Sequence, residues 1–152
     1  MGDALHPEAP RAARVLFLCT HNSARSQMAE ALLRHLAPDR VEAASAGTVA
    51  TRVHPLAIAA MAEKGIGVST QRSKLMDDLF EERFDYVVTV CDNARESCPV
   101  FPGAPKRLHW SLPDPSAVEG SEEVKLQAFR STADELMGRI RLLIARIEGE
   151  DG

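Results

Sequence analysis

The sequence lacks the features that mark membrane, nucleic-acid-binding and disulfide-stapled proteins. No apolar run approaches the roughly 20 residues that a membrane-spanning helix needs. No basic run exceeds two residues and the net charge is -4, which argues against binding to nucleic acid or to an anionic membrane. The three cysteines are an odd number, which argues against a disulfide framework, and they include no Cys-x-x-Cys pair, which argues against a zinc site. We therefore expect a soluble, cytoplasmic protein with reactive or buried thiols and no cofactor.

The 152 residues that are present suit a single domain. With 45% apolar residues, a chain of this length can bury one substantial core. Residues 1–13 mix prolines and charges with alanines and contain no apolar signal-peptide core, so we expect a disordered leader. We expect the domain to span residues 14–148 and to act as a monomer.

Short apolar runs alternate with helical patterns along the chain. The predicted strands are Arg14–Leu18, Val41–Ser45, Phe84–Val90 and Arg107–Trp110, and the predicted helices start near Ser26, span Leu56–Lys64 and run from Ser121 to near the C-terminus. Such alternation predicts an α/β fold, with a small, mostly parallel, four-stranded sheet, helices on both faces and a long C-terminal helix. Ligands bind beyond the carboxyl ends of such strands, where Cys19 and Cys91 fall.

A short loop joins the first predicted strand to the first helix. Its candidate oxyanion-binding residues, after Cys19 itself, are Thr20, His21, Asn22, Ser23, Ala24, Arg25 and Ser26. Converging backbone N–H groups, a helix N-terminus and a guanidinium fork together suit a tetrahedral anion. The same positive field favours the nucleophilic thiolate of Cys19.

Individual loop residues carry further expectations. Asn22 tolerates the left-handed backbone that such a turn often needs, and the Ser26 hydroxyl could donate to the sulfur. His21 could touch the substrate or simply be exposed. The alternative interpretation of the whole loop is a buried small Cys19 and a solvated Arg25.

Cys91 follows the third predicted strand, and Cys98 comes seven residues later. In a helix these two residues would lie about 10 Å apart, beyond the roughly 7 Å between α-carbons that a disulfide tolerates. We therefore predict a segment that is helical when reduced and looped out when oxidised. The alternative is a core cysteine and an unrelated surface thiol.

Asp114 stands between two prolines in a stiff stretch after the fourth predicted strand. If it overhangs the Cys19 loop, its carboxyl group could protonate an oxygen that leaves a tetrahedral centre. The alternative is an ordinary surface Asp-Pro turn.

The motifs together resemble the arsenate reductases that are built on the low-molecular-weight protein tyrosine phosphatase fold. The resemblance is carried by Val15–Glu30, Ser45-Ala46-Gly47-Thr48, Gly65–Ser69, Ser73-Lys74, Val88–Cys91, Cys98-Pro99 and Asp114-Pro115. It implies that Cys19 attacks arsenate, that Arg25 clamps it and that Asp114 assists water loss. It further implies that Cys91 and then Cys98 carry the disulfide outward to thioredoxin or another dithiol.

Two departures from the family pattern are visible. Ala24 stands where relatives often have a cysteine, which rules out a disulfide within the loop. The resemblance also implies a weak potassium site at Asn22, Glu30 and Ser45, although Gly67 stands where such relatives have an aspartate.

Two other functions remain open at this stage. A tyrosine phosphatase would use the same loop and acid, but it needs neither Cys91 nor Cys98, and it would place aromatic residues where Ser116 and Ala117 follow Asp114. A non-catalytic thiol redox sensor would use the cysteines without turnover.

Overall fold

Four parallel strands form the central sheet, in the order β2-β1-β3-β4. They are β1 (Ala13–Cys19), β2 (Val41–Gly47), β3 (Tyr86–Thr89) and β4 (Lys106–His109). The computed structural model describes residues 12–151, apart from residues 69, 93–99 and 104. Cys19 pairs with Gly47 at the carboxyl ends of β1 and β2, and Leu18 pairs with Thr89 at the end of β3. The predicted parallel sheet is confirmed, with Cys19 at the edge where its strands end.

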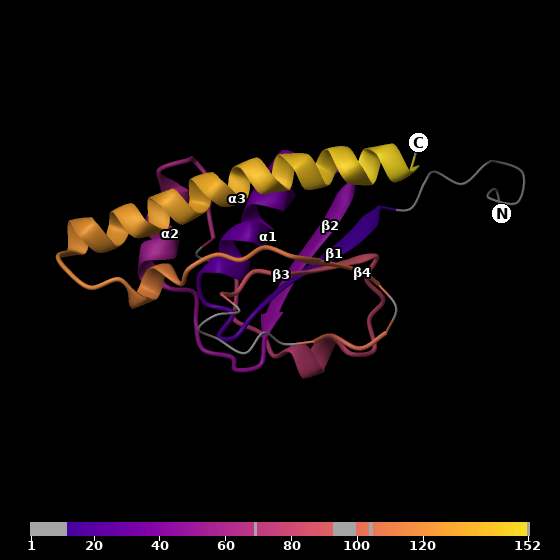
Figure 1. Cartoon of the computed structure of the whole chain (residues 1–152), viewed down its shortest axis with the longest axis horizontal. Coiled ribbons are helices and arrows are strands. Elements are labelled where there is room, and N and C mark those ends of the chain that lie inside the picture. The colour runs from indigo at the N-terminus through magenta and orange to yellow at the C-terminus, as the bar shows by residue number, and fades with distance from the viewer. Residues whose placement is uncertain (1–11, 69, 93–99, 104, 152) are drawn as a thin grey trace, which may run out of the picture.

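Three α-helices and two short 3-10 helices complete the described elements. They are α1 (Arg25–Leu36), α2 (Pro55–Ala62), η2 (Met76–Leu79), η3 (Pro115–Ala117) and α3 (Glu122–Asp151). Figure 1 shows α3 running the length of the molecule across α1 and α2, with the sheet beneath them. The predicted long C-terminal helix is confirmed. Along the described residues, no helix combines the length and the apolar character needed to cross a membrane.

The side chains of β1 alternate between two cores, as the period of a strand requires. Val15 and Phe17 pack with residues of the three α-helices, whereas Leu16 and Leu18 pack on the opposite face with Met76 of η2. Helical structure therefore covers both faces of the sheet, with α-helices on one and a 3-10 helix on the other. All five residues are buried, so the strand that ends in Cys19 is held from both sides.

Several boundaries differ from the sequence prediction. β3 runs from Tyr86 to Thr89, because pairing with both β1 and β4 starts at Tyr86, and Phe84 instead packs against Phe101 in the second core. α2 ends at Ala62, and the following turn reaches Gly65, whose φ of 76° suits glycine. On α3, a stripe of buried apolar residues recurs at steps of three and four, as an amphipathic helix requires; its members are Phe129, Ala133, Leu136, Ile140, Leu143 and Ile147.

Candidate active site

The loop after β1 is tied to its surroundings through its carbonyl groups. The Thr20 carbonyl accepts from the N–H of Val49 at 3.0 Å, and the Ser23 carbonyl accepts from the N–H of His54 at 2.8 Å. The His21 carbonyl accepts from the hydroxyl of Ser73 at 3.0 Å. In a trans peptide the C=O and the next N–H point in opposite directions, so the following N–H groups turn away from these partners. The loop is thereby arranged to present backbone donors.

Cys19 is a buried free thiol at the end of β1. Its Sγ lies 2.8 Å from Ser26 Oγ, and Ser26 Oγ accepts a hydrogen bond from Asn22 Nδ2 at 2.9 Å. Because that bond uses the oxygen as acceptor, the Ser26 hydroxyl hydrogen is available to the sulfur. Asn22 has a φ of 49°, the left-handed conformation that asparagine tolerates. The three side chains form a line of hydrogen bonds that ends on the thiol.

Arg25 begins α1 and reaches the loop that carries Asp114. Its Nη1 donates to the Leu112 carbonyl at 2.8 Å, and its Nη2 lies 3.9 Å from Asp114 Oδ2. The other carboxylate oxygen of Asp114 accepts from the backbone N–H of Ser116 at 2.9 Å, so Asp114 is the N-cap residue of η3. The structure thus brings Arg25 and Asp114 together, with the guanidinium buried and the carboxylate partly exposed.

His54, the N-cap residue of α2, lies close enough to this acid to feel its charge. Its Nδ1 accepts from the N–H of Leu56 at 3.0 Å, and its ring packs on Phe129 with 4.7 Å between ring centroids. Burial lowers the pKa of His54 below its ordinary value, and the negative charge of Asp114 opposes that shift. A cavity of about 320 Å³ lies here, lined by residues that include His54 and Ser116.

Gly47 supports the loop from the end of β2. A Cβ atom at this position would lie 2.5 Å from the Thr20 carbonyl oxygen and 2.9 Å from the Asn22 nitrogen. Only glycine allows such close approach of two backbones. The sequence prediction ended this strand at Ser45 and missed the role of Gly47, although a glycine at the end of a strand is a signal for close contact.

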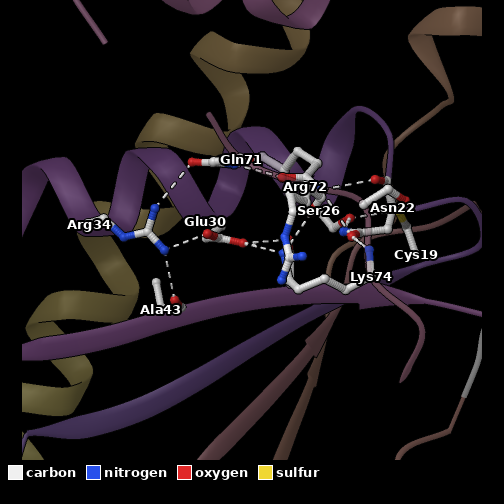
Figure 2. Close-up of polar contacts among 12 residues, drawn as sticks. Cys19, Asn22, Ser26, Glu30, Arg34, Ala43, Gln71, Arg72 and Lys74 are labelled. Atoms are coloured by element: carbon white, nitrogen blue, oxygen red, sulfur yellow. Dashed lines mark hydrogen bonds and ion pairs between the residues drawn. The ribbon is translucent and has the colours of Figure 1, made fainter. Parts of the chain in front are cut away.

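Gln27 and Lys74 are two further supports that sequence reasoning missed. The buried Gln27 amide donates to Asn22 Oδ1 at 2.9 Å and to the Arg72 carbonyl at 2.8 Å. The backbone N–H of Lys74 donates to the same Asn22 oxygen at 2.7 Å. Figure 2 shows how the segment around Arg72 and Lys74 lies against Asn22 and Ser26. Segments distant in sequence therefore fix the Asn22 amide group.

Glu30 and Ser45, two of the three expected potassium ligands, lie together, with Ser45 Oγ donating to Glu30 Oε1 at 2.6 Å. The Lys74 ammonium group lies 3.6 Å from the same oxygen, however. A cation is therefore already supplied at this carboxylate, and the residues do not fit an added potassium ion. Gly67 is exposed and has open space around its α-carbon. Among the described residues no cluster of His, Cys, Asp and Glu could hold a metal ion.

The structure describes some of the remaining candidate site residues and leaves others out. Cys91 is buried just beyond β3, the neighbour of β1, and is disulfide-bonded. Cys98 and the expected switch segment fall in residues 93–99, outside the described residues. His21 is exposed. The Thr20 hydroxyl is buried without a hydrogen-bond partner within the described ranges.

Comparison with known proteins gives consistent matches. Residues 14–151 match the family model described as low molecular weight phosphotyrosine protein phosphatase. An arsenate reductase of Shouchella clausii is 42% identical over 127 residues, which cover 84% of this chain and 91% of that protein. The structure of an arsenate reductase from Archaeoglobus fulgidus matches with a TM-score of 0.73 and 30% identity, over 86% of this chain and 98% of its own. A thioredoxin-dependent arsenate reductase of Corynebacterium glutamicum matches with a TM-score of 0.70 and 34% identity, over 98% of this chain and 68% of its own.

Proposed function

The chain belongs to the low molecular weight phosphotyrosine protein phosphatase family and, within it, to the arsenate reductases, and we propose that it reduces arsenate to arsenite through three thiols. The resemblance carried by the sequence motifs is thereby confirmed at the level of the family. The observation that carries the proposal of reduction is the second buried cysteine, Cys91, just beyond the strand next to β1. The anion loop alone would serve a phosphatase equally well.

In the first step of the proposed reaction, the loop N–H groups and Arg25 bind arsenate. The Cys19 thiolate, held by the Ser26 hydroxyl, attacks the arsenic atom. The hydroxyl group of hydrogen arsenate takes a proton from Asp114 and leaves as water as its bond to arsenic breaks, so that a thiol-arsenate adduct remains. The 3.9 Å contact between Arg25 and Asp114 supports this pairing, because an anion held by Arg25 would lie near the acid.

In the second step the Cys91 thiolate attacks the Cys19 sulfur. The sulfur-arsenic bond breaks, its electron pair stays on arsenic, and arsenite leaves with a Cys19–Cys91 disulfide behind it. The Cys98 thiolate then attacks the Cys91 sulfur and releases the Cys19 thiolate.

An external dithiol closes the cycle by reducing the final disulfide. We propose thioredoxin for this role, because a structural relative is a thioredoxin-dependent arsenate reductase. Reduction by such a dithiol requires a reducing compartment, which favours the cytoplasm. The switch from helix to loop between Cys91 and Cys98 remains part of the proposal, because a helical segment would hold two residues at this spacing too far apart for a disulfide.

Phosphatase activity is the second candidate, since the same loop and acid can support a phosphocysteine intermediate. Ser116 and Ala117, the residues beside Asp114, offer no aromatic surface for a phenyl ring. We therefore expect it only as a weak side reaction. A redox sensor without turnover would need no acid beside Arg25, and the geometry gives it less support.

The test measures arsenate-dependent NADPH oxidation through thioredoxin reductase and thioredoxin. Continuous turnover should be lost in Cys19→Ser, Cys91→Ser and Cys98→Ser. In a single turnover without thioredoxin, Cys98→Ser should still release one equivalent of arsenite, whereas Cys91→Ser should release none. Turnover by Cys91→Ser with thioredoxin would refute the relay. If only Cys19→Ser abolishes activity and phenyl phosphates are good substrates, the phosphatase alternative is correct.

A further inference from the structure

Glu30 is a buried carboxylate inside the helix that starts at the anion loop. It is 4% exposed, its Oε1 accepts from Ser45 Oγ at 2.6 Å, and its Oε2 is paired with Arg34. The Arg34 guanidinium is half-exposed and also donates to the Ala43 carbonyl at 3.1 Å. A buried charge is costly unless it is paired and hydrogen-bonded, so the Oε1 side also needs positive charge.

Lys74 supplies that charge from a segment far away in sequence. Its Nζ lies 3.6 Å from Glu30 Oε1 and donates to the Arg72 carbonyl at 2.8 Å. Figure 2 shows the Glu30 side chain between Arg34 on one side and Lys74 on the other. The ammonium group thus lies against a carboxylate oxygen and a backbone carbonyl oxygen, which are the kinds of atom that also replace the hydration shell of a monovalent metal ion.

The backbone of Lys74 connects this ion pair to the nucleophile. Its N–H donates to Asn22 Oδ1 at 2.7 Å, and its carbonyl accepts from the Gly47 N–H at 2.9 Å. The Asn22 amide then donates to Ser26 Oγ, which lies 2.8 Å from Cys19 Sγ. Displacement of Lys74 would therefore remove the shorter of the two hydrogen bonds that hold Asn22 Oδ1, the other coming from Gln27, and would loosen the Asn22 amide that donates to Ser26.

We propose that Lys74 is a built-in monovalent cation that positions Cys19 through Asn22 and Ser26, so that the enzyme needs no added alkali-metal ion. The kinetic part of this inference rests on the proposed reduction of arsenate. Lys74 is a positioning residue, because its contacts reach the thiol only through the other two side chains.

Removal of the ammonium group should create a dependence on potassium that the native chain lacks. In Lys74→Ala, the Glu30 and Arg72 oxygens would lose the ammonium group that now contacts both, and a small cation could take its place. We expect kcat/KM for arsenate to fall about tenfold in choline chloride, within the range for side chains coupled in one network. Potassium chloride at the same ionic strength should restore most of it. The native rate should be equal in the two salts.

Two further variants distinguish the loss of the positive charge from a general disturbance of the fold. Lys74→Arg keeps a cation and should remain active in choline chloride. Lys64→Ala removes a lysine that pairs with Asp134 on α3, away from the loop, and should match the native chain in both salts. Each variant should have the circular dichroism spectrum of the native chain, which shows that it is folded.

A second measurement does not depend on arsenate. In a Cys91→Ser, Cys98→Ser background, iodoacetamide should alkylate Cys19 more slowly when Lys74→Ala is added in choline chloride, and potassium should restore the rate. If this holds while arsenate is not reduced, the proposed function fails and the inference stands. Three outcomes would each overturn the inference. The first is an equal alkylation rate for Lys74→Ala and the native side chain in choline chloride, and the second is a lowered rate that potassium does not restore. The third is a rate that falls as far in Lys74→Arg as in Lys74→Ala.

Discussion

Replacing Gly47 with alanine should disable the Cys19 loop while leaving the protein folded. The new Cβ would lie 2.5 Å from the Thr20 carbonyl oxygen, 2.7 Å from the Cys19 carbonyl oxygen and 2.9 Å from the Asn22 nitrogen. All three atoms belong to the backbone, so the clash cannot be relieved by moving a flexible side chain. Relative to ordinary contact at 3.4 Å, the closest approach is short by 0.9 Å, and the loop must move by most of that distance.

The size of the effect follows from that displacement. A shift of about 1 Å in a reacting group can cost about 100-fold in rate, so we expect kcat/KM for arsenate to fall about that far. Overpacking costs typically about 1–3 kcal/mol of unfolding free energy, which leaves a domain of ordinary stability folded. Activity should therefore fall much further than the unfolded fraction at the assay temperature can explain.

The assay pairs coupled arsenate reduction with urea unfolding for the native chain and two variants. Gly67→Ala is the matched control, because its Cβ would meet nothing within 4 Å and its backbone is not left-handed. It should keep native activity and native or slightly higher stability. A Gly47→Ala protein with native kcat/KM would refute the argument that this backbone contact fixes the loop.

Three other changes test separate parts of the site. Ser26→Ala removes the hydroxyl beside Cys19 Sγ and should lower kcat/KM for arsenate about ten- to hundredfold, because a hydrogen bond to a charged group has a free energy of that size. An unchanged rate of thiol alkylation would contradict this role. Asp114→Asn should slow the first chemical step about 100-fold or more, measured as single-turnover arsenite release, and a native rate would exclude the acid. Because burial lowers the pKa of His54 below 6.5, the unfolded chain binds its proton first as the pH falls, and stability is lost below about pH 6.5. His54→Asn keeps an acceptor for the Leu56 N–H but cannot titrate, so the fall in its urea midpoint between about pH 7 and 5 should be smaller than that of the native chain.

Much of the fold could be predicted because its signals are local. The apolar run that ends at Cys19 and the stripe through Phe129 and Leu136 each lie within one element, so periodicity alone indicates strand or helix. The nearness of Ser26 to Cys19 was also accessible, since a strand-loop-helix turn brings their side chains together. Boundaries such as the end of α2 at Ala62 were less accessible, because turn formation competes with helix over a few residues.

The supports of the site could not be predicted, because each depends on tertiary contact. Gln27 contacts a carbonyl 45 residues away, and Lys74 holds an asparagine 52 residues away. Neither has a motif that reveals its partner. The pairing of Asp114 with Arg25 was expected only if the loop after β4 overhangs the site, and a rigid stretch between prolines does not specify that position. Gly47 lies just beyond a predicted strand, but the sequence does not indicate which backbone segment approaches it.

The contacts that hold the Cys19 loop from distant parts of the sequence also bear on the stage of folding at which the loop takes its final shape. Cys19 and Ser26 are only seven residues apart, yet the atoms that orient their surroundings come from Gly47, Lys74 and Leu112. Contacts of such sequence separation require closure of long loops and form late relative to local ones. A nascent chain that has made only β1 and α1 would therefore carry an ordinary cysteine. We therefore expect the proposed nucleophile to gain these supports only when the distant contacts have formed.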